Sequence, residues 1–421
     1  MITLLIVVFV VGYAAIAFEQ WIGVNKAATA LITGVGCWTI LSLKDPAATG
    51  AGLAEHFAEI GGILFFLLGA MTIVELIAAH NGFDLITDTI NLKSKRALLW
   101  TIALITFFLS AVLDNLTTAI VMVTLLRRLI TDRDERIWAV GLVVIAANAG
   151  GAWSPIGDVT TTMLWIKGQI TTGPLVLHVF VPSLACVAVP LLISWRRMSG
   201  TFQRPTVAAI EDDGLSRRQR RIVLFAGIGS LLFVPVFKTI THLPPVMGIL
   251  LMVGVLWIIT ELIHGGKDEE QRAPYTLVQA LRGVDTPTIL FFLGILLSVS
   301  ALQSAGVLAV LAQQLGAAMP DVHAQAVFIG LVSAVVDNVP LVAAAQGMYA
   351  EAFATDHTFW ILLAYCAGTG GSVLIIGSAA GVAAMGMERI GFFWYAKRIG
   401  GLALAGYLAG AGVYLAQRAL F

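Results

Sequence analysis

The chain has 421 residues, of which 58% are hydrophobic and only 12% charged, and its formal net charge is zero. Soluble domains carry about 25% charged residues, so this composition excludes a soluble protein, and the balanced charge gives no basis for a nucleic-acid partner. Apolar runs long enough to cross a bilayer recur along the chain without strand-like alternation. We therefore predict an all-α polytopic membrane protein with lipid as its surroundings, and not an enzyme.

Taken in chain order, the apolar segments form two comparable sets separated by one polar stretch. The N-terminal segment lacks the basic start and the cleavage site of a signal peptide, so it is interpreted as a retained first span. The predicted spans are 2–18, 27–43, 60–80, 137–166 and 174–195 in the first set, and 222–238, 245–263, 287–303, 359–386 and 399–417 in the second.

Two further apolar segments, 97–127 and 323–349, are each predicted to form a re-entrant hairpin. Basic residues flank the first at both ends, among them Arg96 and Arg127, which places both ends in the cytoplasm. No Lys or Arg occurs between Gln303 and Asp356, so both ends of the second segment are expected outside. The hairpins would then enter the membrane from opposite faces.

Each hairpin carries the same motif, an aspartate followed by an asparagine in apolar sequence. Ser-Ala-Val-Leu-Asp-Asn-Leu at 110–116 returns as Ser-Ala-Val-Val-Asp-Asn-Val at 333–339. An ionisable residue at membrane depth is costly and by default marks an ion pathway, and its duplication indicates a transporter built from internal repeats. We predict a first repeat at 1–195, an arginine-rich cytoplasmic linker at 196–221 and a second repeat at 222–421. Because each repeat has five spans, an odd number, the repeats would be inverted.

One span in each repeat is interrupted by glycine. Gly150-Gly151 and Gly157 in 137–166 correspond to Gly370-Gly371 and Gly377 in 359–386. Glycine weakens a helix by about 1 kcal/mol relative to alanine, so these spans are predicted to be discontinuous helices with unwound backbone near the midplane. The alternative is that the small residues only permit close helix packing.

Three aspartates are then expected at the midplane, and they are our candidate ligands for Na⁺ or Li⁺ in competition with H⁺: Asp114, Asp158 and Asp337. A poorly hydrated carboxylate can hold a proton or a small cation, and competition between the two is the minimum requirement for antiport. Neutral oxygens for the same site are expected from Asn115, Thr117, Thr118, Asn148, Ser154, Thr160, Asn338, Thr369, Ser372 and Ser378.

Simpler structural roles remain open for the same residues. Asp114 and Asp337 are suited to N-capping the helix that follows each hairpin tip, and Asp158 to starting a helix in contact with water. Glu75 is a weaker candidate, because it lies near a span end without an acidic counterpart in the second repeat. His178, His242 and His264, also near span ends, are expected at the membrane interface. Three cysteines fall singly in apolar sequence, which indicates neither a zinc site nor a disulfide framework.

The combined pattern resembles the ion transporter superfamily, and within it the NhaD-type sodium/proton antiporters. The resemblance rests on four stretches: 113–118, Asn148–Asp158, 337–340 and Gly368–Ser378. It implies a homodimer whose subunits have a scaffold domain and a transport domain, with the hairpins and broken helices in the transport domain, which would move in an elevator-type step. Dicarboxylate carriers of this superfamily carry Ser-Asn-Thr at each hairpin tip, where this chain has an acidic residue. Repulsion between like charges disfavours a carboxylate substrate here.

We therefore predict a secondary antiporter that exchanges Na⁺ or Li⁺ for H⁺ and needs no cofactor. The expected location is a bacterial cytoplasmic (inner) membrane. The alternative is an arsenite, oxyanion or carboxylate carrier of the same superfamily.

Overall fold

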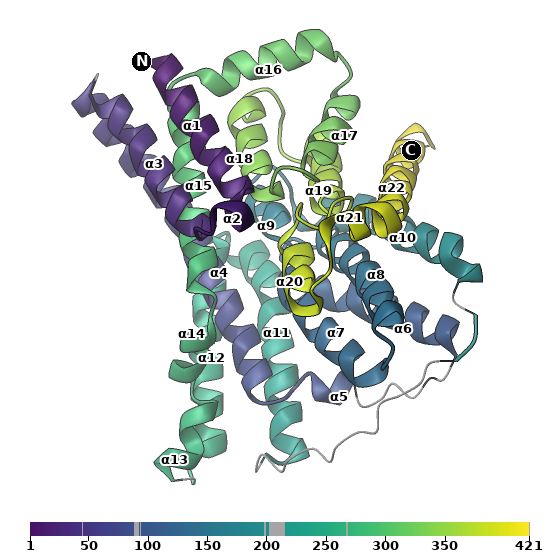
Figure 1. Ribbon diagram of the computed structural model, residues 1–421. Coiled ribbons are helices and arrows are strands. Elements are labelled where there is room, and N and C mark those ends of the chain that lie inside the picture. Colours follow the sequence, from purple (N-terminus) through teal and green to yellow (C-terminus); the bar gives the residue numbers. More distant parts are fainter. Residues whose placement is uncertain are drawn as a thin grey trace.

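The computed structural model describes residues 1–43, 45–87, 92, 94–197, 199–201, 215–266 and 268–420. In these residues the regular structure is helical, and the only strand-like pairing is an isolated bridge between Ser94 and Thr201. The helices, shown in Figure 1, are α1 (Ile2–Ala17), α2 (Glu19–Ile22), α3 (Lys26–Ser42), α4 (Pro46–Ala79), α5 (Asp84–Thr87), α6 (Lys95–Ser110), α7 (Asn115–Leu129), α8 (Arg133–Ala152), α9 (Val159–Ile166), α10 (Thr172–Ile193), η1 (Ser194–Arg196), α11 (Arg217–Thr241), α12 (Pro245–His264), α13 (Glu269–Arg272), η2 (Ala273–Tyr275), α14 (Leu277–Gly283), α15 (Thr286–Ser304), α16 (Val307–Ala318), α17 (Val322–Val332), α18 (Asn338–Tyr349), α19 (Thr358–Gly370), α20 (Ala379–Glu388), α21 (Phe392–Tyr395), η3 (Ala396–Gly400) and α22 (Gly401–Leu420).

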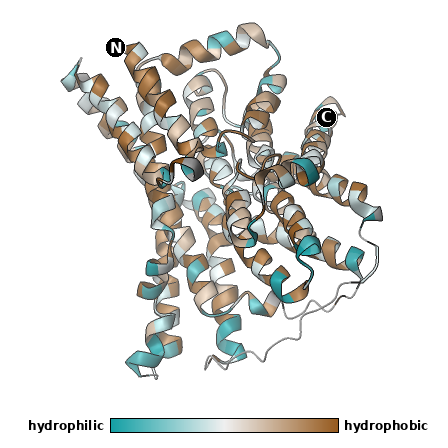
Figure 2. Ribbon diagram, in the orientation of Figure 1, coloured by the Kyte–Doolittle hydropathy of each residue, from teal (hydrophilic) through white to brown (hydrophobic). Residues whose placement is uncertain are grey.

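Six helices in the described part of the chain are long and apolar enough to cross a membrane. They are α4, α10, α11, α12, α15 and the stretch from α21 to α22, and α16 with α17 makes a seventh if this pair, bent by 116°, is counted as one span. Figure 2 shows hydrophobic residues along the middle of the bundle and hydrophilic residues concentrated towards its lower end. These features agree with the prediction of an all-α polytopic membrane protein. The expected spans 2–18 and 27–43 form shorter helices, α1 with 16 residues and α3 with 17.

Two helices begin earlier than the segments predicted from the sequence. The span expected at 60–80 belongs to α4, which already begins at Pro46 and has 34 residues. Its first turns are rich in alanine, which favours helix without being strongly apolar, so hydropathy alone does not reveal them. The linker expected at 196–221 also ends early, because Ser216 forms a capping box with Gln219 and α11 begins at Arg217. Residues 202–214 of that linker lie outside the described part.

The helices pack as two groups that lie side by side in Figure 1. The first group, on the left, contains α1, α3, α4, α11, α12, α14 and α15, and within it α3 packs along α15 and α4 packs against α11 and α12. The second group, on the right, contains α6 to α10 and α17 to α22, in which α8 contacts α6, α7, α10 and α19. The groups meet where α15 contacts α18 and α4 contacts α9, while α16 runs across the top of the view towards α17.

Small residues allow the two central helices of the first group to touch. A methyl group at Gly34 of α3 would lie 2.6 Å from the carbonyl oxygen of Gly294 in α15. Trp38, one turn further along α3, donates its indole N–H to the carbonyl oxygen of Leu297 at 2.9 Å. Close backbone approach and an interhelical hydrogen bond are the usual means of holding helices together in lipid. These contacts hold α3 directly against α15.

A buried ion cluster ties the second group together at the arginine-rich end of the bundle. The carboxylate of Glu388, at the end of α20, accepts from Arg127 Nε at 2.6 Å and from Arg136 Nε at 3.0 Å. Arg127 also donates to the carbonyl oxygen of Met387, and Arg133 donates to the carbonyl oxygen of Glu388 at 3.3 Å. The sequence predicts these arginines only as orientation signals, because nothing local links them to a glutamate some 250 residues away.

One of the histidines expected at the membrane interface is buried in contacts with other helices. His264, the last residue of α12, is 1% exposed, and its Nε2 atom lies 3.0 Å from Nε2 of His80. Its ring also stacks on Tyr275 with ring centroids 5.0 Å apart. The partners come from the end of α4 and from η2, which only the tertiary fold brings to this position.

Candidate functional site

Four interruptions in the helices of the second group surround the candidate site. They separate α6 from α7, α8 from α9, α17 from α18 and α19 from α20. The segments 97–127, 137–166, 323–349 and 359–386 are therefore each divided into two helices. A new helix starts after every interruption, with Asp114, Asp158, Asp337 or Ser378 as its N-cap residue. Helix N-termini carry unpaired N–H groups and partial positive charge, which suit acidic and hydroxyl side chains.

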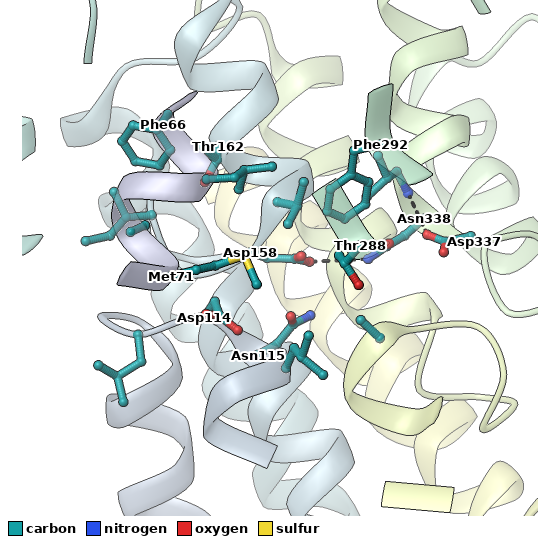
Figure 3. A pocket seen from close by; sticks show the side chains of 18 of the residues that line it. Phe66, Met71, Asp114, Asn115, Asp158, Thr162, Thr288, Phe292, Asp337 and Asn338 are labelled. Carbon is teal, nitrogen blue, oxygen red and sulfur yellow. Dashed lines mark hydrogen bonds between the residues drawn. The ribbon is translucent and has the colours of Figure 1, made fainter. Parts of the chain in front are cut away.

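A cavity of about 60 Å³ lies at the point where these N-termini approach the first group. Its polar lining includes five of the predicted residues, shown in Figure 3: Asp114, Asn115, Asp158, Asp337 and Asn338. A space of this kind can admit water or one partly hydrated small cation. The duplicated Asp-Asn motif is thus brought together in one place.

Asp114 is held by the first turn of the helix that it caps. Its Oδ1 accepts the backbone N–H of Thr117 at 2.7 Å, and its Oδ2 accepts the Thr117 hydroxyl at 2.9 Å. The backbone of Asp114 has φ of 131°, in the region that favours glycine. Such strain is tolerated where the surroundings fix the residue, and it clusters at functional sites.

Asp158 connects the two halves of the chain. Its Oδ2 accepts from the Thr160 hydroxyl at 2.9 Å and from Asn338 Nδ2 at 3.3 Å. The side chain is 2% exposed, and among the described residues neither Asp158 nor Asp114 forms an ion pair. A buried carboxylate without a cationic partner is costly. Both residues are therefore suited to binding a proton or a cation.

Behind the cavity, amide and hydroxyl groups form a second link between the halves. Asn115 Nδ2 donates to Asn148 Oδ1 at 3.0 Å, and Asn148 Nδ2 donates to the hydroxyls of Ser372 at 2.9 Å and Ser378 at 2.8 Å. Ser378 also accepts the N–H of Gly381 at 3.1 Å, as an N-cap does. The network fixes the orientation of Asn115, which lines the cavity.

The remaining predicted residues do not line the cavity. Thr369 donates back to the carbonyl oxygen of Tyr365 at 2.6 Å, and Ser154 accepts from the N–H of Ile156 at 3.4 Å. Thr118 is fully buried, and its hydroxyl has no hydrogen-bond partner in the described part of the chain. The broken helices thus contribute fewer side chains than the sequence predicts.

Glycines at corresponding positions of the two broken helices make the same kind of contact. A methyl group at Gly150 would overlap the carbonyl oxygen of Phe107 in α6, and one at Gly370 would overlap that of Gly330 in α17. In both halves the discontinuous helix therefore packs directly on the backbone of the preceding hairpin. Close packing, which the sequence left as an alternative role for these glycines, occurs together with the interruption of the helix.

A serine in each hairpin repeats this correspondence. Ser110 donates its hydroxyl to the carbonyl oxygen of Ala147 at 2.6 Å, and Ser333 lies 3.4 Å from the carbonyl oxygen of Ala367. Each bond joins the end of the first hairpin helix to the helix that is interrupted next. The local architecture of the two halves is therefore alike, although Asp158 is acidic and its counterpart Ser378 is not.

The opposite wall of the cavity comes from the first group, and sequence reasoning missed it. Phe66 and Met71 of α4, Thr288 and Phe292 of α15, and Lys26 at the start of α3 line this side. A lone basic residue ahead of an apolar run is the only signal in the sequence, and it is indistinguishable from an orientation signal. No local motif marks the wall, because its members come from three separate helices.

A larger cavity of about 450 Å³ adjoins the first and shares Lys26, Met71 and Thr288 with it. Its lining includes the acidic residues Glu19, Glu75 and Asp285. Glu75 thus lies on the wall of this vestibule, not in the smaller cavity. Acidic side chains along an approach raise the local concentration of cations.

Three carboxylates line the smaller cavity without forming a cluster. No group of three or more His, Cys, Asp or Glu in the described residues could jointly hold a metal ion. Any cation bound here would need amide, hydroxyl or carbonyl oxygens besides a carboxylate, as hard cations accept. This donor set fits a transported ion, held weakly enough to leave.

Comparison with known sequences identifies the family. A sequence model of the citrate transporter family matches residues 13–368. Sodium/proton antiporter 1 of Arabidopsis thaliana is 51% identical over 97% of this chain and 71% of its own length, and sodium/proton antiporter 2 of the same plant is 49% identical over 97% and 98%. The Na(+)/H(+) antiporter NhaD of Halomonas elongata is 30% identical over 97% of this chain and 87% of its own length. The chain therefore belongs to the citrate transporter family within the ion transporter superfamily, in a group whose named relatives are sodium/proton antiporters of plants and bacteria.

Proposed function

We propose that this protein is a secondary antiporter that exchanges Na⁺, or Li⁺, for H⁺ across a membrane. The observation that carries the proposal is the cavity lined by Asp158, which is buried, and by Asp114, which is partly buried; the described residues supply no basic partner for either carboxylate. The names of the relatives support Na⁺ and H⁺ as the exchanged ions. A site that holds either a proton or a cation, but not both, couples their opposite movements.

Asp158 is the proposed centre of the site. It already has two neutral neighbours, the Thr160 hydroxyl and the Asn338 amide, and the amide oxygen of Asn338 can turn towards a bound cation. Asp114 and Asp337 are proposed to supply further carboxylate oxygens. Protonation of these groups would release the cation, so we expect the apparent KM for Na⁺ to rise as the pH falls.

The arrangement of the helices supports inverted repeats and an elevator-type step, which we include in the proposal. The matching contacts of Gly150 and Gly370 support two equivalent halves, and the pair α6 and α7 lies in the lower half of Figure 1 whereas α17 and α18 lie in the upper half. Most of the polar lining belongs to the second group, and the first group forms a largely apolar wall. The second group would be the moving transport domain and the first group the scaffold of a homodimer. A bacterial inner membrane remains our proposed location.

The alternative is a carrier of carboxylates or of arsenite or another oxyanion, and the description of the family favours testing citrate. Three aspartates at the cavity would repel a carboxylate substrate. Arsenite can be neutral, so charge does not exclude it. The substrates must therefore be compared directly.

The test uses proteoliposomes with an imposed proton gradient and a fluorescent pH probe. Na⁺, Li⁺, K⁺, arsenite and citrate are added in turn. We expect Na⁺ or Li⁺ to dissipate the gradient, and Asp158→Asn and Asp114→Asn to abolish this response. Asparagine is as good an N-cap as aspartate, so the substitutions remove charge while leaving the helix starts intact.

Asp132→Asn is the matched control, because Asp132 is an exposed acidic N-cap of α8 that accepts the N–H of Glu135 at 2.8 Å. It should retain exchange. A wild-type response to arsenite or citrate, with none to Na⁺ or Li⁺, would refute the antiporter proposal. Normal exchange in Asp158→Asn would refute the assignment of the site.

A further inference from the structure

Lys26 occupies a position at the start of a helix where a positive charge is unfavourable. It is the first residue of α3, directly after the N-cap Asn25. A cation at a helix N-terminus opposes the helix dipole, and acidic residues are preferred there. The position of this lysine is therefore not explained by the stability of its own helix.

The ammonium group of Lys26 is directed to the candidate site. Its Nζ lies 3.9 Å from Asp337 Oδ2 and 4.4 Å from the centroid of the Phe291 ring. Phe291 is 1% exposed, so the ring is a fixed neutral support for the charge. Lys26 lines both the small cavity and the vestibule. Glu19 accepts the backbone N–H of Lys26 at 3.0 Å, and Glu75 and Asp285 line the vestibule with it.

The pair also joins the two groups of helices. Lys26 belongs to α3 of the first group, and Asp337 caps α18 of the second. Both side chains are only partly exposed, 25% for Lys26 and 21% for Asp337. Asp337 thus differs from Asp114 and Asp158, for which the described residues offer no ion pair.

We propose that the Lys26 ammonium is a built-in competitor for the transported cation at Asp337, which sets how tightly the site binds Na⁺. This inference rests on the proposed function. In the ion-free site the ammonium pairs with the Asp337 carboxylate. A sodium ion that reaches Asp337 has to separate the ammonium from the carboxylate. The ammonium then keeps its contact with the Phe291 ring.

Removing the charge therefore strengthens sodium binding. Exposed ion pairs contribute up to about 1 kcal/mol, and this partly buried pair somewhat more, so we expect Lys26→Gln to lower the Kd for Na⁺ by about threefold to tenfold. Lys26→Arg keeps the competing charge and should bind Na⁺ as the wild type does. In an Asp337→Asn background, Lys26→Gln should have no further effect.

The chain offers a closely matched control in Lys167. It lies 3.0 Å from Glu59 and is 26% exposed, and its pair also connects the second group to the first, but it does not line the small cavity. Lys167→Gln should leave the Kd for Na⁺ unchanged. It controls for the loss of a lysine–carboxylate pair between the same two groups.

The experiment measures binding of ²²Na⁺ to the purified full-length protein in detergent at one alkaline pH. A lower Kd in Lys26→Gln, with Lys26→Arg and Lys167→Gln unchanged, supports the proposal. An unchanged or higher Kd in Lys26→Gln, while the wild type binds Na⁺, overturns it and leaves the antiporter proposal intact. Absence of ²²Na⁺ binding by the wild type would instead overturn the proposed function itself.

Discussion

Neutralising Glu388 should destabilise the second group of helices without touching the cavity. In Glu388→Gln the guanidinium groups of Arg127 and Arg136 lose a buried carboxylate whose side chain is 3% exposed. Breaking a buried ion pair costs about 3–5 kcal/mol, and since Arg127 is 46% and Arg136 18% exposed we expect a smaller cost of about 2–4 kcal/mol. With an unfolding entropy of about 2.1 cal/mol/K per residue over 421 residues, 1 kcal/mol corresponds to about 1 °C. The melting temperature should fall by roughly 2–4 °C.

A thiol-reactive fluorescent dye provides the assay, because all three cysteines are free and buried and react only when the protein opens. Glu59→Gln is the control, since it removes the same charge from a pair in which Glu59 is 47% exposed. Exposed pairs contribute about 0–1 kcal/mol, so this variant should melt within about 1 °C of the wild type. If Glu388→Gln and Glu59→Gln have the same melting temperature, the ion pairs of Glu388 with Arg127 and Arg136 do not stabilise the second group of helices.

Three further outcomes are expected. Gly370→Ala should sharply reduce the yield of folded protein in size-exclusion chromatography, because its methyl group would overlap the backbone of Gly330. Gly386→Ala places nothing within 4 Å of the new methyl group and should give a normal yield in the same assay. Asn148→Ala removes the amide that donates to Ser372 and Ser378, and it should raise the KM for Na⁺ in vesicles while the protein still folds. An unchanged KM would show that the hydrogen bonds of Asn148 do not orient Asn115 in the cavity. Thr117→Val removes the hydroxyl that donates to Asp114 but keeps the backbone N–H that donates to the same carboxylate. The loss of one hydrogen bond of about 1 kcal/mol should weaken Na⁺ exchange about threefold to tenfold.

Helix starts and helix interruptions could be predicted from the sequence, because their physical causes lie within a few neighbouring residues. An aspartate followed by an asparagine in apolar sequence marks a helix start in both hairpins, and α7 and α18 do begin at Asn115 and Asn338. Glycine pairs likewise marked the two interrupted spans. Five predicted side chains, at the starts of α7, α9 and α18, line one cavity.

The failures share a different cause. Lys26 and Glu388 obtain their partners from helices hundreds of residues away, and no periodicity in the sequence encodes such a pairing. His264 is buried for the same reason. The hydroxyl of Thr369 donates to a carbonyl oxygen of its own helix, as threonine commonly does in apolar surroundings, and residue type alone does not indicate this. Composition and motifs locate the interruptions, and tertiary packing decides which side chains face the cavity.

The hydrogen bond between Asp158 and Asn338 can form only late in biosynthesis. The two residues are separated by 180 positions, and at about 5–20 residues per second the ribosome needs roughly 10–40 s to add the second after the first. During that interval the nascent first half carries a costly acidic group in apolar sequence without its later amide partner. The surroundings of Asp158 are therefore complete only after the segment that carries Asn338 has been inserted.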